Sequence, residues 1–139
     1  MAFYTPPMTE TQQQPSKGQR FTKAERLLSR SDFDRVFSHK VSAGDTQLTL
    51  HISANGTGLA RLGLIVSKAN GGSPRRNRLK RLLREAFRLN KGAFAGFDLV
   101  LLPRGARTPD SFVLLQQSLL SLFEKAHAEW QRRAAGRAS

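Results

Sequence analysis

The chain has 139 residues, which is enough for one domain with a modest core. Lys and Arg number 23 against 10 Asp and Glu, so the formal net charge is +13 and the pI is near 11.6. This balance attracts polyanions and leaves nucleic acid, an anionic membrane surface or an acidic partner as candidates, whereas the lack of cysteine excludes disulfides and thiolate metal sites. With no apolar run of roughly 18 residues and no secretory signal pattern, we expect a cytoplasmic protein.

Residues 1–20 are predicted to be a disordered tail. They contain Pro6, Pro7, Pro15 and a polar run, and such a segment buries too little apolar surface to offset the entropy lost on ordering. Residues 134–139 are expected to fray for similar reasons. The residues between these ends, 21–133, are expected to form one domain.

The first predicted element is a short helix over residues 31–37. Ser31 is a favourable cap, and the acids that follow it suit the positive end of a helix. The i, i+3, i+4 spacing places three apolar residues on one face: Phe33, Val36 and Phe37. On spacing alone, the two aromatic residues are more often core than binding surface.

Two strand patterns follow, over residues 47–53 and 61–67. In the first, Leu48, Leu50 and Ile52 alternate with polar residues. The second is a more continuous apolar run, as in a strand covered on both faces. The sequence Asn-Gly-Thr-Gly at residues 55–58 joins the two as a turn, which predicts an antiparallel hairpin.

The second half of the chain is predicted to begin with a longer helix. Ser73 and Pro74 suit the cap and the first position of a helix that Gly92 ends. A strand over residues 97–102 and a last helix over residues 109–130 follow. We therefore expect an α+β fold, in which a small mixed sheet of about four strands packs with three helices in the order α-β-β-β-α-β-α.

The longer helix carries most of the excess charge. Residues 75–91 contain eight basic residues and one acid, which is +7 of the net +13. Solvated helix faces usually mix the two signs at i, i+4 spacing, whereas like charges at this spacing repel. Arginine outnumbers lysine here and suits forked contacts to phosphate. The helical period gathers the apolar residues on the opposite side, at Leu79, Leu82, Leu83, Ala86 and Phe87.

This pattern predicts binding to RNA. A basic helix lying on a membrane is the rival, but the core needs the apolar side of the helix, so we expect no membrane partner. DNA is disfavoured because no homeodomain, zinc-finger or leucine-zipper pattern occurs. Aromatic residues near cations suit unpaired strands of RNA.

Within the basic helix, residues 76–87 read Arg-Asn-Arg-Leu-Lys-Arg-Leu-Leu-Arg-Glu-Ala-Phe. This block resembles the signature of a known family, the protein subunit of bacterial ribonuclease P. Residues 31–37, 61–68 and 97–104 resemble three further blocks of the family in the same order. The resemblance covers about residues 26 to 125, and four blocks in sequence are more specific than one triplet.

The resemblance implies a role in tRNA maturation. In this family a large RNA with bound Mg²⁺ is the catalyst, the protein is an accessory subunit, and the holoenzyme removes the 5′ leader from precursor tRNA. The helix is implied to face the catalytic RNA through Arg76, Asn77, Arg78, Lys80, Arg81, Arg84 and Arg88. A cleft between the first helix and the sheet is implied to hold the single-stranded leader through Phe33, Phe37, Leu48, His51, Ser67 and Lys68.

The resemblance also implies an unusual topology, and this chain departs from the family's pattern at two places. It implies a left-handed β-α-β crossover at the basic helix, against the usual right-handed rule. His51 stands where the family commonly has an aromatic residue, and histidine can stack on a base while adding pH dependence. Residues 71–74 read Gly-Gly-Ser-Pro in place of the loop that is usual before the basic helix.

No catalytic side chain is assigned to this chain. A protein ribonuclease needs a general acid and base or carboxylates that hold metals, and no such constellation is readable. The three histidines lack metal-ligand spacing, so no metal is expected on the protein. Two alternatives stay open: another basic RNA-binding module, such as a ribosome-associated protein, and an autonomous nuclease.

Overall fold

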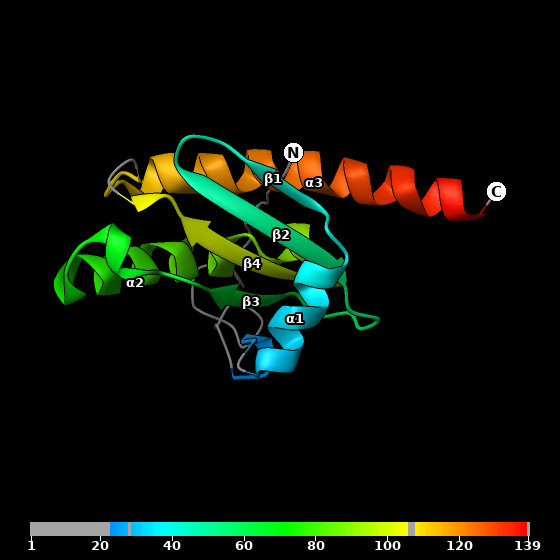
Figure 1. The fold of residues 1–139 in the computed structure, drawn as a ribbon, viewed down its shortest axis with the longest axis horizontal. Helices are drawn as coiled ribbons and strands as arrows, with labels where there is room; N and C mark the ends of the chain where they lie inside the picture. The colour runs from blue at the N-terminus through cyan, green and yellow to red at the C-terminus, as the bar shows by residue number, and fades with distance from the viewer. Residues whose placement is uncertain (1–22, 28, 106–107, 139) are drawn as a thin grey trace, which may run out of the picture.

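The computed structural model describes residues 23–27, 29–105 and 108–138, so the tail predicted over residues 1–20 lies outside the described residues. The described chain has the predicted α+β fold in the predicted order, with a four-stranded mixed sheet and three α-helices. In Figure 1, α1 lies in front of the sheet and the long α3 runs along its upper side. The helices are α1 (Arg30–Ser38), α2 (Ser73–Leu89) and α3 (Phe112–Ala138), and the strands are β1 (Ser42–Gly44), β2 (Leu48–Ala54), β3 (Arg61–Leu64) and β4 (Phe97–Pro103).

The strand order of the sheet is β1-β2-β4-β3. β2 pairs antiparallel with β4 over its whole length, and β3 pairs parallel with the other edge of β4. The predicted hairpin between residues 47–53 and 61–67 is therefore wrong, because β4 lies between β2 and β3. Strands buried on both faces take the centre of a sheet, and β4 is the most continuously apolar of the four.

The alternation along the strands gives the sheet an inner and an outer face. Leu50 and Ile52 of β2 and Leu99 and Leu101 of β4 are fully buried on the inner face. The apolar sides of α2 and α3 cover this face and complete the main core. The crossover from β3 through α2 to β4 joins neighbouring parallel strands, and its left-handed sense stays a prediction.

The outer face is covered at one end by α1. Val36 of α1 packs with Val100 of β4 and with Leu27 in a second, smaller core. The ring of Phe33 lies against the sheet at Gly63, where a Cβ atom would come within 2.7 Å of the ring. Glycine at this position therefore allows the close approach of α1.

The helix ends differ from the sequence expectations. Ser29 rather than Ser31 caps α1, and its side chain accepts a hydrogen bond of 3.1 Å from the Asp32 amide. Gly72 occupies the cap position of α2 without a side-chain bond, and Ser73 is the first helical residue. α3 continues to Ala138, beyond the predicted end of the last helix at residue 130.

Candidate nucleic-acid interface

α2 is positioned by its apolar side. The predicted residues Leu79, Leu83, Ala86 and Phe87 are fully buried against the sheet and α3, and Leu82 packs at the edge of the same core. A helix fixed in this way must turn its opposite side to solvent. All seven residues expected to face RNA therefore lie on one helix at exposed or half-buried positions: Arg76, Asn77, Arg78, Lys80, Arg81, Arg84 and Arg88.

Some of these side chains have protein partners. Arg78 forms an ion pair of 3.5 Å with Asp110, and Arg88 pairs with Glu85 one turn earlier on the same helix. The hydrogen bonds from Arg88 lower the pKa of the Glu85 carboxyl below its ordinary value. Arg76 donates to the Gly71 carbonyl at 3.1 Å, so its cationic charge meets no carboxylate there.

The middle of α2 holds the least compensated charge. Within the described ranges, no carboxylate lies within ion-pair distance of Lys80, Arg81 or Arg84. Burial lowers the pKa of the Arg84 guanidinium, and the positive charge of Arg26 lowers it further. A shallow pocket of about 400 Å³ lies on this face and is lined by Asn77, Arg81, Arg84, Glu85 and Arg88. Polyphosphate opposite this face would relieve the repulsion.

Sequence reasoning missed what holds the start of α2. Arg75 donates to Asp110 at 3.0 Å and to the Thr108 carbonyl at 2.5 Å, which ties the helix to the loop after β4. The buried Asn70 accepts a hydrogen bond of 2.7 Å from the Gly105 amide of the same loop. These partners are more than 30 residues apart in the sequence, and no local pattern signals them.

The second candidate surface is the outer face of the sheet beside α1. We call it the outer sheet surface and define it by residues that are half-buried or exposed there. Phe37 meets His51 edge to face with ring centroids 4.8 Å apart, which brings two predicted residues together. The members of the surface are Phe33, Phe37, Thr49, His51, Ile65 and Leu102.

The remaining residues that were predicted to contact the leader lie elsewhere. Leu48 is fully buried in the main core on the inner face, so the expectation that it lines the cleft is corrected. Its separation of three residues from His51 places the two side chains on opposite faces of β2. Ser67 and Lys68 are exposed in the segment after β3, where Ser67 occupies the position before the 3-10 helix Lys68–Asn70 without a side-chain cap hydrogen bond.

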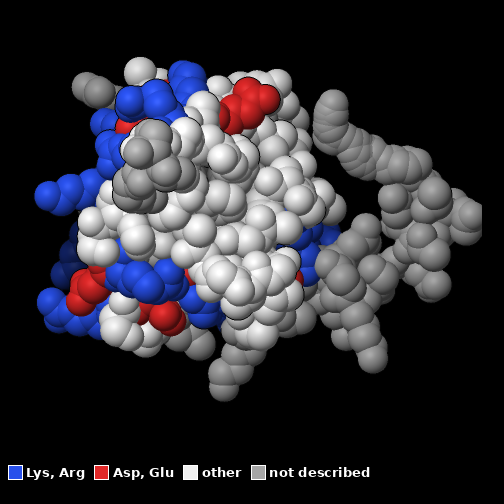
Figure 2. Space-filling view, turned by 90° about the vertical axis from the view of Figure 1, so that its right-hand side faces the viewer, with Lys and Arg blue, Asp and Glu red and all other residues white. Residues whose placement is uncertain are grey.

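Figure 2 shows how charge is distributed at the end of the molecule that lies to the right in Figure 1. Lys and Arg gather mostly along the side of this view that corresponds to the front of Figure 1, and the middle of the view is mainly uncharged. α1 lies on that front side. Positive charge, with some acidic residues among it, therefore marks the side of the molecule where α1 lies.

His51 is the unusual member of the outer sheet surface. It is half-buried, and its buried Nδ1 atom has no hydrogen-bond partner among the described residues. Burial lowers the pKa of its imidazole below the ordinary value of 6.5. The ring is therefore neutral at physiological pH, when it can act as both donor and acceptor.

Groups of three or more His, Asp or Glu side chains that could hold a metal ion are absent from the described residues. None of their helices is both long and apolar enough to cross a lipid bilayer.

Comparison with known sequences identifies relatives over most of the chain. The family model described as Ribonuclease P matches residues 21–127. The ribonuclease P protein components of Thermotoga maritima and Clostridium kluyveri are each 36% identical to this chain, over 110 and 104 residues. The alignments cover 76% and 73% of this chain and 94% and 93% of those proteins.

Solved structures give the same result. A mutant of the Staphylococcus aureus RNase P protein with defective mRNA degradation activity superposes with a TM-score of 0.68 at 28% identity, covering 76% of this chain and 90% of that one. The RNase P protein of Thermotoga maritima superposes with a TM-score of 0.63 at 36% identity, covering 70% of this chain and 93% of that one.

The lowered pKa of His51 predicts a pH-dependent stability. Below pH 6.5 the unfolded chain takes up a proton at this ring before the folded chain does, so stability falls as the pH falls through and below 6.5. We expect His51→Phe to lose less unfolding free energy than the wild type between pH 7.5 and 5.5, as measured by urea denaturation. Thr49→Ser, a change without a titrating group on the same surface, should keep the wild-type pH dependence. Identical profiles for wild type and His51→Phe would contradict the prediction.

Proposed function

Since this chain belongs to the family of bacterial ribonuclease P protein components, we propose that α2 binds the catalytic RNA while the outer sheet surface binds the leader of precursor tRNA. The chain is the protein component of a ribonuclease P endoribonuclease and assists the 5′ processing of precursor tRNA. The RNA subunit and precursor tRNA are its partners by that membership. We propose no DNA or membrane partner, and a cytoplasmic location.

The observation that carries the proposal is the uncompensated charge on α2. Lys80, Arg81 and Arg84 repel one another on a helix whose other side is fixed in the core. A folded RNA supplies phosphates at many positions along such a stripe, and guanidinium groups contact phosphate in a forked geometry. Binding of this kind releases counterions and becomes weaker as salt rises.

The outer sheet surface suits an unpaired strand better than a helix of RNA. Its rings and apolar side chains offer stacking partners, and every base has a flat face that can stack. Phe37 and His51 form the centre of this surface, with Phe33 beside them. We propose that leader nucleotides lie here while Ser67 and Lys68 contact the backbone nearby.

We assign no chemical step to a side chain of this protein. The described residues hold no carboxylate or histidine cluster for a metal, and we propose that Mg²⁺ is held by the RNA subunit. The protein contributes binding energy and orientation, which bring the scissile bond to the catalytic RNA in a productive geometry. Cations on α2 also reduce the repulsion between RNA phosphates.

Reconstitution separates this role from that of an autonomous nuclease. We expect purified protein alone to leave precursor tRNA intact, and the mixture of protein and catalytic RNA to cleave it at Mg²⁺ concentrations too low for the RNA alone. The measurement is the release of the 5′ leader on a denaturing gel. Cleavage by protein alone would replace the proposal with a protein-catalysed reaction.

Arg81→Ala tests the role of α2. Loss of one phosphate contact should flatten the dependence of log affinity for the catalytic RNA on log salt by about one unit of slope. Arg132→Ala is the matched control, because it removes the same charge from the exposed surface of α3. Equal changes in slope for the two variants would mean that net charge, and not the position on α2, determines binding.

Phe37→Ala tests the outer sheet surface. If a leader base stacks on this ring, binding of leader-bearing precursor to the holoenzyme should weaken by about 1–3 kcal/mol, with a smaller effect on mature tRNA. Leu27→Ala serves as the control, since it opens the same small core beneath α1 without removing a ring from the surface. Equal losses for both variants on both substrates would favour a purely structural role for Phe37.

A further inference from the structure

The position of α1 determines where the rings of the outer sheet surface lie. Phe33 and Phe37 both belong to this helix of nine residues. Its apolar contact with the sheet is small, because Val36 is its only fully buried side chain. Other interactions must therefore fix its distance and angle relative to the strands.

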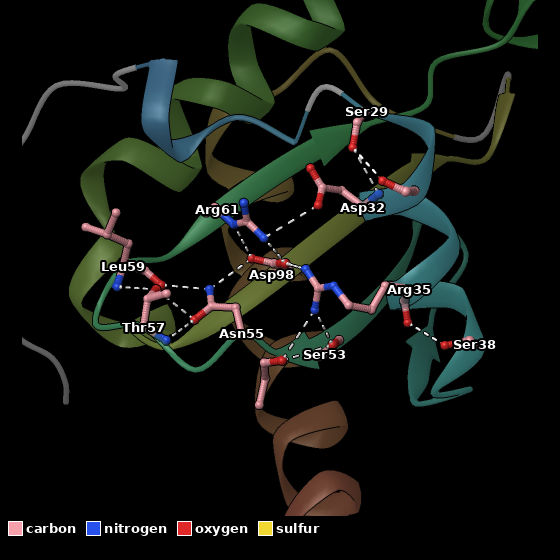
Figure 3. A network of polar contacts seen from close by, with 12 residues as sticks. Ser29, Asp32, Arg35, Ser38, Ser53, Asn55, Thr57, Leu59, Arg61 and Asp98 are labelled. Atoms are coloured by element: carbon pink, nitrogen blue, oxygen red, sulfur yellow. Dashed lines mark hydrogen bonds and ion pairs between the residues drawn. The ribbon is translucent and has the colours of Figure 1, made fainter.

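A polar network centred on Asp98 supplies these interactions (Figure 3). Asp98 lies on β4 with its side chain fully buried beneath α1. Arg61 of β3 donates to both of its oxygens, at 2.8 and 2.7 Å, and Asn55 donates at 2.9 Å. Arg35 of α1 reaches down to the same carboxylate and also donates to the Ser53 hydroxyl at 3.1 Å.

The network connects α1 to three strands at one point. Arg35 joins the helix to β4 and β2, and Asp32 approaches the Arg61 guanidinium at 3.9 Å. Burial by itself would raise the pKa of the Asp98 carboxyl, but the hydrogen bonds that it accepts outweigh burial and keep the pKa below its ordinary value. The carboxylate is thus a fixed negative charge, and a buried charge strongly favours the geometry that keeps all of its donors.

We propose that Asp98 is a positioning residue for leader binding, which acts through Arg35 to hold α1 and its two aromatic rings over the sheet. This inference rests on the proposed role of the outer sheet surface. Asp98 is fully buried, so its role in binding is indirect. Its effect is to keep Phe33 and Phe37 at the spacing from His51 that an unpaired strand requires.

Asp98→Asn is the direct test because it keeps the size of the side chain. Each carboxylate oxygen of Asp98 accepts two hydrogen bonds. In either orientation of the asparagine amide, its NH₂ group would therefore face two N–H donors and lose both bonds. The change also raises the net charge by one, which by charge alone would strengthen binding to RNA. Weaker binding would therefore report a change in geometry.

We expect Asp98→Asn to weaken binding of leader-bearing precursor to the reconstituted holoenzyme by about tenfold, the size of effect that supporting networks produce. Affinity for mature tRNA and for the catalytic RNA should change by less than about twofold, because α2 lies on the other face of the sheet. Glu25→Gln is the matched control. It makes the same change in a buried carboxylate, which pairs with Lys91 at 2.8 Å.

A second pair of variants decides the matter if Asp98→Asn does not fold at the assay temperature. Arg35→Met removes the arm from α1 and leaves the contacts of Asp98 with Arg61 and Asn55, whereas Arg35→Lys keeps the charge and can still reach the carboxylate. We expect Arg35→Met to lose the preference for leader-bearing precursor over mature tRNA, and Arg35→Lys to retain most of it. Unchanged leader selectivity in Asp98→Asn, or in Arg35→Met, would overturn the inference.

The same assay separates this inference from the proposed function. A wild-type holoenzyme that binds leader-bearing and mature tRNA equally would overturn the role of the outer sheet surface, and the inference with it. A wild-type preference that Asp98→Asn retains would overturn the inference alone.

Discussion

Burial of the inner face of the sheet is the constraint on which the rest of the molecule depends. Leu50, Ile52, Leu99 and Leu101 form a continuous apolar surface, and the apolar sides of α2 and α3 cover it. Burial of this kind is the main favourable term in folding, at about 25 cal/mol for each Å² of apolar surface. Because α2 must give its apolar side to the core, the cations in the middle of its other side, Lys80, Arg81 and Arg84, face solvent or a ligand.

The distribution of acidic residues adds to this contrast between the buried apolar side of α2 and its cationic side. Buried carboxylates serve the fold: Asp98 fastens α1, and Glu25 pairs with Lys91 beyond the end of α2. Near the start of α2, Asp110 pairs with Arg75 and Arg78. The middle of the helix is left without such partners in the described chain, so uncompensated positive charge coincides with the centre of the surface that we assign to the catalytic RNA.

Much of the fold could be predicted because its signals are local. The periods of two and 3.6 residues located β2, β3, β4 and the three helices, and the one-sided charge indicated the side of α2 that we propose binds RNA. Alternation shows which residues share a face but not which strands are neighbours, and this is why the hairpin prediction was wrong. The same alternation places Leu48 and His51 on opposite faces of β2, so the sequence alone could have excluded Leu48 from the cleft. The Asp98 network and the anchoring of Arg75 join residues far apart in the chain, and one sequence without aligned relatives offers no pattern for them.

The central place of β4 dictates when the protein can fold during synthesis. β4 is the last strand to be made, yet it is the principal partner of both β2 and β3. Until residues 97–103 leave the ribosome, β2 and β3 have few partners among the described residues: β2 has the three-residue β1 beside it, and β3 has the single bridge from Leu62 to Arg26. A hairpin would have closed early from neighbouring residues, whereas this sheet waits for a distant segment, and such non-local pairing slows folding. The residues of α2, the most basic helix, are therefore synthesised before the sheet that α2 packs against can be completed.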